Sequence, residues 1–215
     1  MQRLRVTFSK GGAFRYTSNL DLQKSLDRLF RRANLPVAYS QGFHPQPKMN
    51  IAAPLPLGWQ GEQELFEVWL SESREPNALH QDLSHNAPSG IEIMCVQEID
   101  LNSPAIQSLV LSLDYAVTVP GEFDAVGVQA KIDQILASPS LPRTRRGKRY
   151  DLRPLIINID QQIAQAAGVP VIHMLLGANQ DATGRPDEVL DEMGFDPFLA
   201  RISRTRINLK QDEPG

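Results

Sequence analysis

Apolar residues follow two rhythms along the first part of the chain. In Leu4–Ser9 apolar and polar residues alternate, which predicts a half-buried strand. In the segment that follows, apolar residues recur at i, i+4, i+7 and i+8, which predicts a helix with one buried stripe: Leu22, Leu26, Leu29 and Phe30. Ser18 or Asn19 can cap this helix, and Arg31 and Arg32 suit its last turn. Part of the basic charge in this region therefore has a structural explanation.

Alternation and turn residues predict four more elements before residue 100. Strands are expected at Val37–Ser40, Leu65–Leu70 and Ile91–Ile99, and a helix that begins with proline is expected at Pro76–Asn86. Together with the first strand and helix, these elements give the order β-α-β-β-α-β.

The second half of the chain repeats this order without obvious sequence identity. The elements expected there are a strand at Leu109–Val119, a helix at Phe123–Ala137, strands at Tyr150–Ile159 and Val169–Leu176, a helix at Pro186–Met193 and a strand at Ile202–Leu209. We therefore predict an α+β fold with two tandem ferredoxin-like, split β-α-β halves, residues 1–101 and 108–215. The expected core residues are Leu22, Leu26, Leu29, Phe30, Phe66, Val68, Ile91, Ile93, Leu111, Leu113, Ile132, Ile135, Ile157, Ile172 and Leu190.

The net charge of −3 conceals two basic segments. The first fifty residues carry nine basic and two acidic side chains, so the remainder of the chain is acidic by −10. Within that remainder, the segment PRTRRGKRYDLR contains six basic residues and only Asp151 as an acid: Arg143, Arg145, Arg146, Lys148, Arg149 and Arg153. Two basic segments in an acidic chain indicate local positive surfaces for a phosphate-bearing partner, with solvated faces as the alternative.

The segment Tyr39–Gly58 is rich in glycine and proline but is neither highly charged nor of low complexity. It is typical of a rigid loop that presents side chains. Basic groups near it can contact phosphates, while Tyr39, Phe43 and His44 offer flat faces for an unpaired base. The predicted nucleic-acid-binding residues are Lys10, Arg15, Arg28, Arg31, Arg32, Tyr39, Phe43, His44 and Lys48, together with Arg143, Arg145, Arg146, Lys148 and Arg149 of the second segment.

The sequence offers little support for cofactor chemistry. Its one cysteine, Cys95, lies in an apolar alternation and is expected to pack, and a lone thiol supplies neither a disulfide nor the ligand set of a cluster. His80, His85 and His173 form no metal-binding pattern, so we interpret them as structural or solvent-facing. We predict no cofactor and no metal. No apolar run approaches the roughly 20 residues that span a bilayer, so we expect no membrane contact and a cytoplasmic location.

The succession FSKGGAFRYTSNLDLQKSLDRLFRRANLPVAYSQGFHPQPKMNIAAPLPLG resembles the amino-terminal signature of the radical SAM-linked proteins, a domain of unknown function. The segments KRYDLRPLI and GRPDEVL are similar to later motifs of that family, so the resemblance covers nearly the whole chain. Members are fused to radical SAM proteins or encoded as separate chains. The chain departs from the family at Asn19, where histidine is usual.

The resemblance implies an accessory or substrate-recognition domain that works with a radical SAM enzyme or domain, in a setting of ribosomal or transfer RNA. Catalysis would then belong to the partner, because three clustered cysteines are needed for the four-iron cluster. Two alternatives stay open. The chain could be a metal-independent endoribonuclease that uses His44, Tyr39 or Ser40, and Lys48. It could instead be a protein-docking module that contacts the radical SAM partner through Arg143–Arg153.

Overall fold

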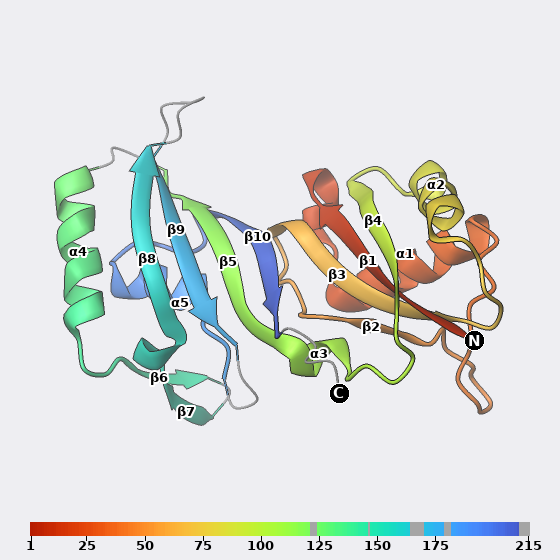
Figure 1. Ribbon diagram of the computed structural model, residues 1–215. Coiled ribbons are helices and arrows are strands. Elements are labelled where there is room, and N and C mark those ends of the chain that lie inside the picture. Colours follow the sequence, from red (N-terminus) through yellow and green to blue (C-terminus); the bar gives the residue numbers. More distant parts are fainter. Residues whose placement is uncertain (121–123, 146, 164–169, 179–181, 211–215) are drawn as a thin grey trace. The chain divides into compact units, whose positions relative to one another are not determined.

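The computed structural model describes residues 1–120, 124–145, 147–163, 170–178 and 182–210, and it has a mixed α+β fold (Figure 1). The chain divides into two compact units, and each is described by itself below. The first unit comprises Met1–Val110 with Lys210, and the second comprises Leu111–Leu209. In the part of the chain that is described, no helix is both long and apolar enough to cross a membrane.

The first unit contains a four-stranded antiparallel sheet with the order β4-β1-β3-β2. Two helices, α1 and α2, lie beside this sheet (Figure 1). The elements in chain order are β1 (Gln2–Lys10), a 3-10 turn η1 (Gly12–Tyr16), α1 (Asn19–Arg32), β2 (Met49–Ile51), β3 (Gln60–Leu70), α2 (Pro76–Asn86), β4 (Ile91–Ile99) and the short α3 (Ile106–Leu109).

One face of this sheet forms the core of the first unit with α1 and α2. The predicted stripe on α1 is buried, and Phe30 packs its ring 5.7 Å from the ring of Phe66 on β3. The Ser18 hydroxyl accepts the backbone N–H of Asp21, so Ser18 caps the helix as the sequence predicted. On β1 and β3 the core residues alternate with the opposite face, which carries Arg3, Glu67 and other polar side chains.

The second strand was placed wrongly by the sequence analysis. Val37–Ser40 forms only isolated bridges, Val37 to Leu70 and Tyr39 to Pro47, and the regular strand is Met49–Ile51 on β3. The prolines around Tyr39 explain the shift, because proline has no backbone N–H and interrupts a ladder of hydrogen bonds.

The second unit has a sheet with the order β10-β5-β9-β8 and a separate two-stranded hairpin. The elements in chain order are β5 (Val110–Thr118), α4 (Ala125–Ala137), β6 (Pro142–Arg145), β7 (Lys148–Asp151), a 3-10 turn η2 (Arg153–Leu155), β8 (Ile156–Ile163), β9 (Pro170–Gly177), α5 (Pro186–Glu192) and β10 (Arg201–Leu209). β6 and β7 form the hairpin, which the sequence analysis did not predict.

The single strand expected at Tyr150–Ile159 is in fact two strands separated by η2. Pro154 has no N–H to continue a ladder. The Asp151 carboxylate also turns the chain, because its Oδ1 accepts the backbone N–H groups of Leu141 and Arg153. These contacts end β7 and close the base of the hairpin.

Most of the predicted core residues of the second unit are buried, but two are not. Ile157 is 54 % exposed because it is the extra residue of a bulge on β8, where the pairing with β9 shifts between Ile156 and Asn158. Leu111 is 45 % exposed at the beginning of β5. Side chains at a strand end have neighbours on one side only.

Candidate functional site

The loop after α1 is held at its neck by backbone hydrogen bonds. The N–H of Lys48 donates to Ala38 O at 2.7 Å, and the N–H of Ser40 donates to Gln46 O at 2.9 Å. Ala38 and Lys48 in turn exchange bonds with the backbone of Trp69 on β3. The neck is thus fixed to the sheet, and residues 41–45 form a tip between fixed ends.

Aromatic side chains of this loop face solvent. Phe43, at the tip, is fully exposed, His44 is exposed and Tyr39 is 40 % exposed. The Tyr39 hydroxyl lies 3.5 Å from Asp27 Oδ1 on α1, so the loop is placed beside the carboxyl end of the helix. Phe43 plays no part in the core, because its side chain contacts none of it.

Three arginines stand at this end of α1. Arg31 pairs with Asp27 at 3.0 Å, and hydrogen bonding and charge attraction from Asp27 raise the pKa of Arg31 above its ordinary value. Arg32 donates to the carbonyl of Asn86 at 3.0 Å, and Arg28 is exposed. We call Arg28, Arg31, Arg32, Tyr39, Phe43 and His44 the loop surface.

Three predicted members of the first basic set lie apart from the loop surface. Lys10 is buried and its ammonium donates to Thr17 O, so its prediction as a surface contact is wrong. Lys48 is exposed, but its ammonium lies 5.0 Å from the centroid of the Trp69 ring, on the sheet face opposite α1. Arg15 is half-buried and stacks on Tyr16. Sequence proximity did not show which face each cation would take.

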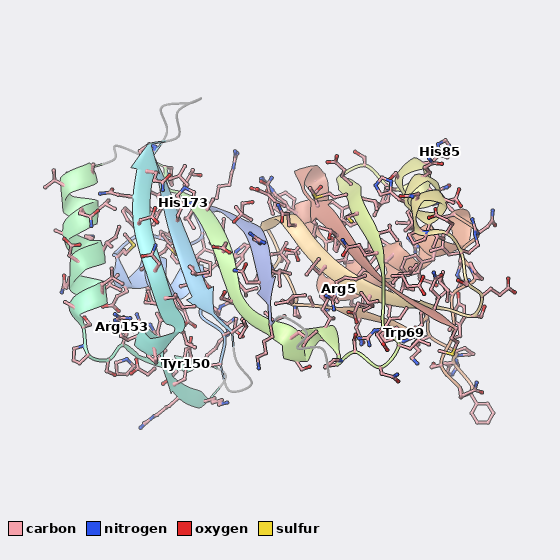
Figure 2. All side chains as sticks on the ribbon, viewed as in Figure 1. Arg5, Trp69, His85, Tyr150, Arg153 and His173 are labelled. Carbon is pink, nitrogen blue, oxygen red and sulfur yellow. The ribbon has the colours of Figure 1, made fainter. Side chains whose placement is uncertain are left out.

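The sheet face opposite α1 carries a buried ion-pair cluster, one member of which, Arg5, is labelled in Figure 2. The Glu67 carboxylate accepts the guanidinium groups of Arg3 and Arg5, at distances of 2.5 and 2.9 Å, and the Glu67 side chain is fully buried. The other donors of Arg3 reach the carbonyls of Leu101, Ser103 and Pro104. All five N–H groups of Arg3 therefore have acceptors, which is the condition for burying an arginine.

The second basic segment forms the β6–β7 hairpin, and its cations divide between two faces. Register pairs Arg143 with Tyr150 and Arg145 with Lys148, which puts these four side chains on one face, while Thr144 and Arg149 take the other. Gly147 has a φ of 80°, a conformation that suits glycine at the hairpin turn. Arg146 lies outside the described residues.

Carboxylates of α5 pair with the first of these faces. Arg143 pairs with Glu192, Arg145 lies 3.4 Å from Glu188, and the Tyr150 hydroxyl donates to Glu188. These groups are partly exposed, unlike the Arg3 cluster. Arg153 instead uses its guanidinium on the carbonyls of Leu136 and Ile156, so it is structural.

A cavity of about 250 Å³ opens beside this hairpin, which we call the hairpin pocket. Its lining residues are Arg145, Lys148, Tyr150, Ala182, Thr183 and Arg185. Gly184 lets the 182–185 segment approach closely, because a Cβ there would lie 2.9 Å from Leu176 Cβ and 3.1 Å from Leu155 O. The sequence analysis missed Tyr150, Thr183 and Arg185. Gly184, directly before Arg185 and Pro186, was the sequence feature that could have indicated this close approach.

Among the described residues, no group of three or more His, Cys, Asp or Glu side chains is arranged to hold a metal ion. His80 lies 3.2 Å from the carbonyl of Ile93, which is a structural contact, and His85 is exposed. His173 and Cys95 are half-buried on strands. In the described part of the chain no hydrogen bond joins His44 to Tyr39, Ser40 or Lys48, so the geometry gives no support to the nuclease arrangement.

The fold and its two cationic surfaces define a mixed α+β protein of two compact units. Residues 3–186 match a family described as an uncharacterized protein conserved in bacteria (DUF2344), and the chain belongs to this family. A comparison with curated proteins found no match. Among solved structures, the chain is similar to one from a Cbf5-Nop10-Gar1 complex, with a TM-score of 0.50 and 10 % identity. The likeness covers 97 % of this chain but only 50 % of the other, and it shows the fold alone.

Proposed function

We propose that this chain is a non-catalytic recognition domain that binds single-stranded RNA through the loop surface. The observation that carries the proposal is the full exposure of Phe43 on a loop whose neck is fixed by backbone hydrogen bonds. A fully exposed phenyl ring loses hydrophobic stabilisation unless a partner covers it. The fixed neck means that little conformational entropy is lost when the ring is covered.

Charge near the ring favours a nucleic acid as the partner. Arg28, Arg31 and Arg32 stand on the adjoining helix end, and Asp27 offsets only part of their charge. Cations that neutralise phosphates and aromatic rings that stack on bases are the two components of single-strand binding. Tyr39 and His44 add further flat faces on the same loop.

Each unit is, we infer, a version of the ferredoxin-like split β-α-β fold. The first unit has the strand order 4-1-3-2 of that fold, and in the second unit β5, β8, β9 and β10 take the same order. The β6–β7 hairpin is then an insertion before β8. This fold serves RNA binders, enzymes and regulatory modules alike, so the functional proposal depends on the loop surface.

We further propose that the domain works beside a radical SAM enzyme, as the resemblance of its motifs implies. The chain has one cysteine and so lacks the set of thiolates that holds a four-iron cluster. The reaction would belong to the partner, and this chain would position the RNA. Docking through the Arg143–Arg153 segment is the alternative role, although Arg143, Arg145 and Arg153 already have partners within the unit.

The test is binding of a fluorescent single-stranded RNA, followed by anisotropy at several salt concentrations. We expect Phe43→Ala to cost about 1–3 kcal/mol of binding free energy with little change in salt dependence, because it removes a stacked base. Changing Arg28 and Arg31 to Gln should lower the slope of log K against log salt by roughly one unit for each phosphate that the protein no longer neutralises.

Two matched variants control this test. Phe198→Ala removes a similarly exposed phenylalanine from the second unit, and Lys24→Gln removes an exposed cation from the amino-terminal half of α1. Neither should change RNA affinity. Folded wild-type protein without salt-sensitive affinity for RNA would overturn the proposal, and so would equal losses in Phe43→Ala and Phe198→Ala.

A further inference from the structure

The hairpin pocket has a chemically uniform lining. Every lining side chain except that of Ala182 ends in a hydrogen-bond donor: two guanidinium groups, one ammonium and two hydroxyls. Among the residues that the structure describes, no acidic side chain lines the cavity. A pocket lined in this way suits an anion with several acceptor oxygens.

These donors come from segments far apart in the sequence. Arg145 and Lys148 face each other across the end of the hairpin, and Tyr150 follows on the same face. Thr183 and Arg185 arrive from the segment before α5, which is tied to β9 by the Gly184 N–H to Gly177 O bond of 2.8 Å. Two backbone elements fix the positions of the five donors.

Carboxylates outside the pocket hold several of these donors in place. Glu188 accepts from Arg145 and from the Tyr150 hydroxyl, and Asp187 accepts from Arg185 at 2.7 Å. The carboxylates reduce the orientational freedom of the guanidinium groups, so less entropy is lost when an anion binds.

We propose that the hairpin pocket binds a phosphate monoester group. A carboxylate ligand has two oxygens and is satisfied by one arginine fork, whereas a phosphate presents three oxygens and accepts from several donors at once. The cavity of about 250 Å³ lies below the usual range for drug-sized ligands, so it fits a phosphate with a small attached group. The phosphate can come from a free phosphorylated small molecule or from the terminal phosphate of an RNA.

This site goes beyond the proposed RNA surface and does not depend on it. All its lining residues belong to the second unit, whereas the loop surface belongs to the first. Phe43→Ala should therefore leave phosphate binding unchanged, and loss of the pocket donors should leave the stacking contribution of Phe43 unchanged. Failure of one proposal is thus distinguishable from failure of the other.

The experiment titrates the full chain with three probes: inorganic phosphate, ribose 5-phosphate, and a pair of short RNAs that differ only in a 5′-phosphate or 5′-hydroxyl. Calorimetry measures the small probes and anisotropy measures the RNAs. Arg145→Gln and Lys148→Gln should each weaken phosphate-dependent binding about tenfold, since each removes a charge-assisted hydrogen bond. Tyr150→Phe should weaken it by a smaller factor, because it removes the hydroxyl that donates to Glu188, the carboxylate that holds Arg145 in place.

The matched control is Arg149→Gln, which removes the neighbouring cation on the opposite face of the same hairpin. It should change affinity by less than about twofold, because an exposed charge outside the pocket is screened by salt. Binding of ribose 5-phosphate with this pattern supports a small-molecule source, and a preference for 5′-phosphorylated RNA with this pattern supports an RNA end.

Two results would overturn the proposal. One is the absence of phosphate-dependent binding of any probe by folded wild-type protein. The other is an equal loss in Arg149→Gln and Lys148→Gln, which would show a general charge effect. Circular dichroism checks that each variant is folded. If Arg145→Gln is unstable, Lys148→Gln and Tyr150→Phe still test the proposal.

Discussion

Both units contain ion pairs between arginine and glutamate, and these pairs are buried in the first unit but partly exposed in the second. In the first unit Glu67 joins Arg3 and Arg5 beneath the surface, and the exposed fractions of the Arg3 and Glu67 side chains are 2 % and 0 %. In the second unit the Arg145–Glu188 pair has exposed fractions of 40 % and 16 %. The same pair of residue types is thus buried in one unit and partly open to solvent in the other.

This difference shows that the number of basic residues does not reveal which of them are structural and which are candidates for binding a ligand. A buried guanidinium has used all its donors on the protein, so it stabilises one arrangement and binds nothing else. A partly exposed guanidinium beside a carboxylate contributes little to stability, but it is held in position for an incoming anion. Burial, more than charge, separates structural arginines from candidate ligand-binding ones.

The largest effect that tests this comparison is expected for Glu67→Ala. It leaves the Arg3 guanidinium buried without its carboxylate, which should lower the free energy of unfolding by about 3–5 kcal/mol. Urea unfolding followed by tryptophan fluorescence reports on this unit, because both tryptophans, Trp59 and Trp69, lie within it. A loss below about 1 kcal/mol would contradict the structural role of the cluster.

The corresponding change in the second unit is Glu192→Gln, which removes the partner of Arg143. We expect a loss of about 0.2–1 kcal/mol, because the pair is partly exposed and the change keeps the volume of the side chain. Urea unfolding followed by circular dichroism measures it. A loss as large as that of Glu67→Ala would remove the contrast between the two clusters.

The smallest effect concerns Asp151 and appears only in acid. Hydrogen bonds from the backbone N–H groups of Leu141 and Arg153 hold the pKa of Asp151 below its ordinary value of 3.8. A depressed pKa in the folded state gives stability that is present above 3.8 and is lost as the pH falls through the folded pKa. The melting temperature of the wild type should therefore fall more between pH 5 and pH 3 than that of Asp151→Asn.

Thermal scans of the two proteins at a series of pH values check this prediction. Parallel pH dependence in both would show that the Asp151 carboxylate does not stabilise the base of the hairpin. Asp160→Asn is a suitable control, because Asp160 lies on β8 and accepts only from neighbouring side chains.

The sequence predicted the elements with strong periodicity and missed those defined by single side chains. α1 and α2 followed from helical spacing with a cap or a proline, and β4 followed from alternation. The β6–β7 hairpin could not be predicted in this way, because its short strands are polar and its boundary depends on the Asp151 carboxylate. Ile157 was misplaced because a bulge leaves no mark in the apolar pattern.

The candidate sites were predictable only in part. Phe43 and the arginines of α1 were predicted from a local signal, an aromatic in a glycine- and proline-rich loop beside a basic helix, and the structure leaves them exposed. Their role in binding stays a prediction. Lys10 was misassigned because its burial depends on how η1 folds back over β1, which sequence spacing does not show. Arg185 comes 37 positions after Lys148 in the chain, and only the fold brings both residues to the hairpin pocket.

The neck of the α1 loop separates what maintains the fold from what meets a partner. Its bonds join main-chain atoms of Ala38, Ser40, Gln46 and Lys48, and none of them depends on the identity of the side chain at Phe43. Apart from Gly42, whose φ of 130° favours glycine, the residues of the tip can therefore change while the neck and sheet stay as they are. A substitution at the tip can thus alter what the loop contacts while the hydrogen bonds that hold the neck to β3 persist.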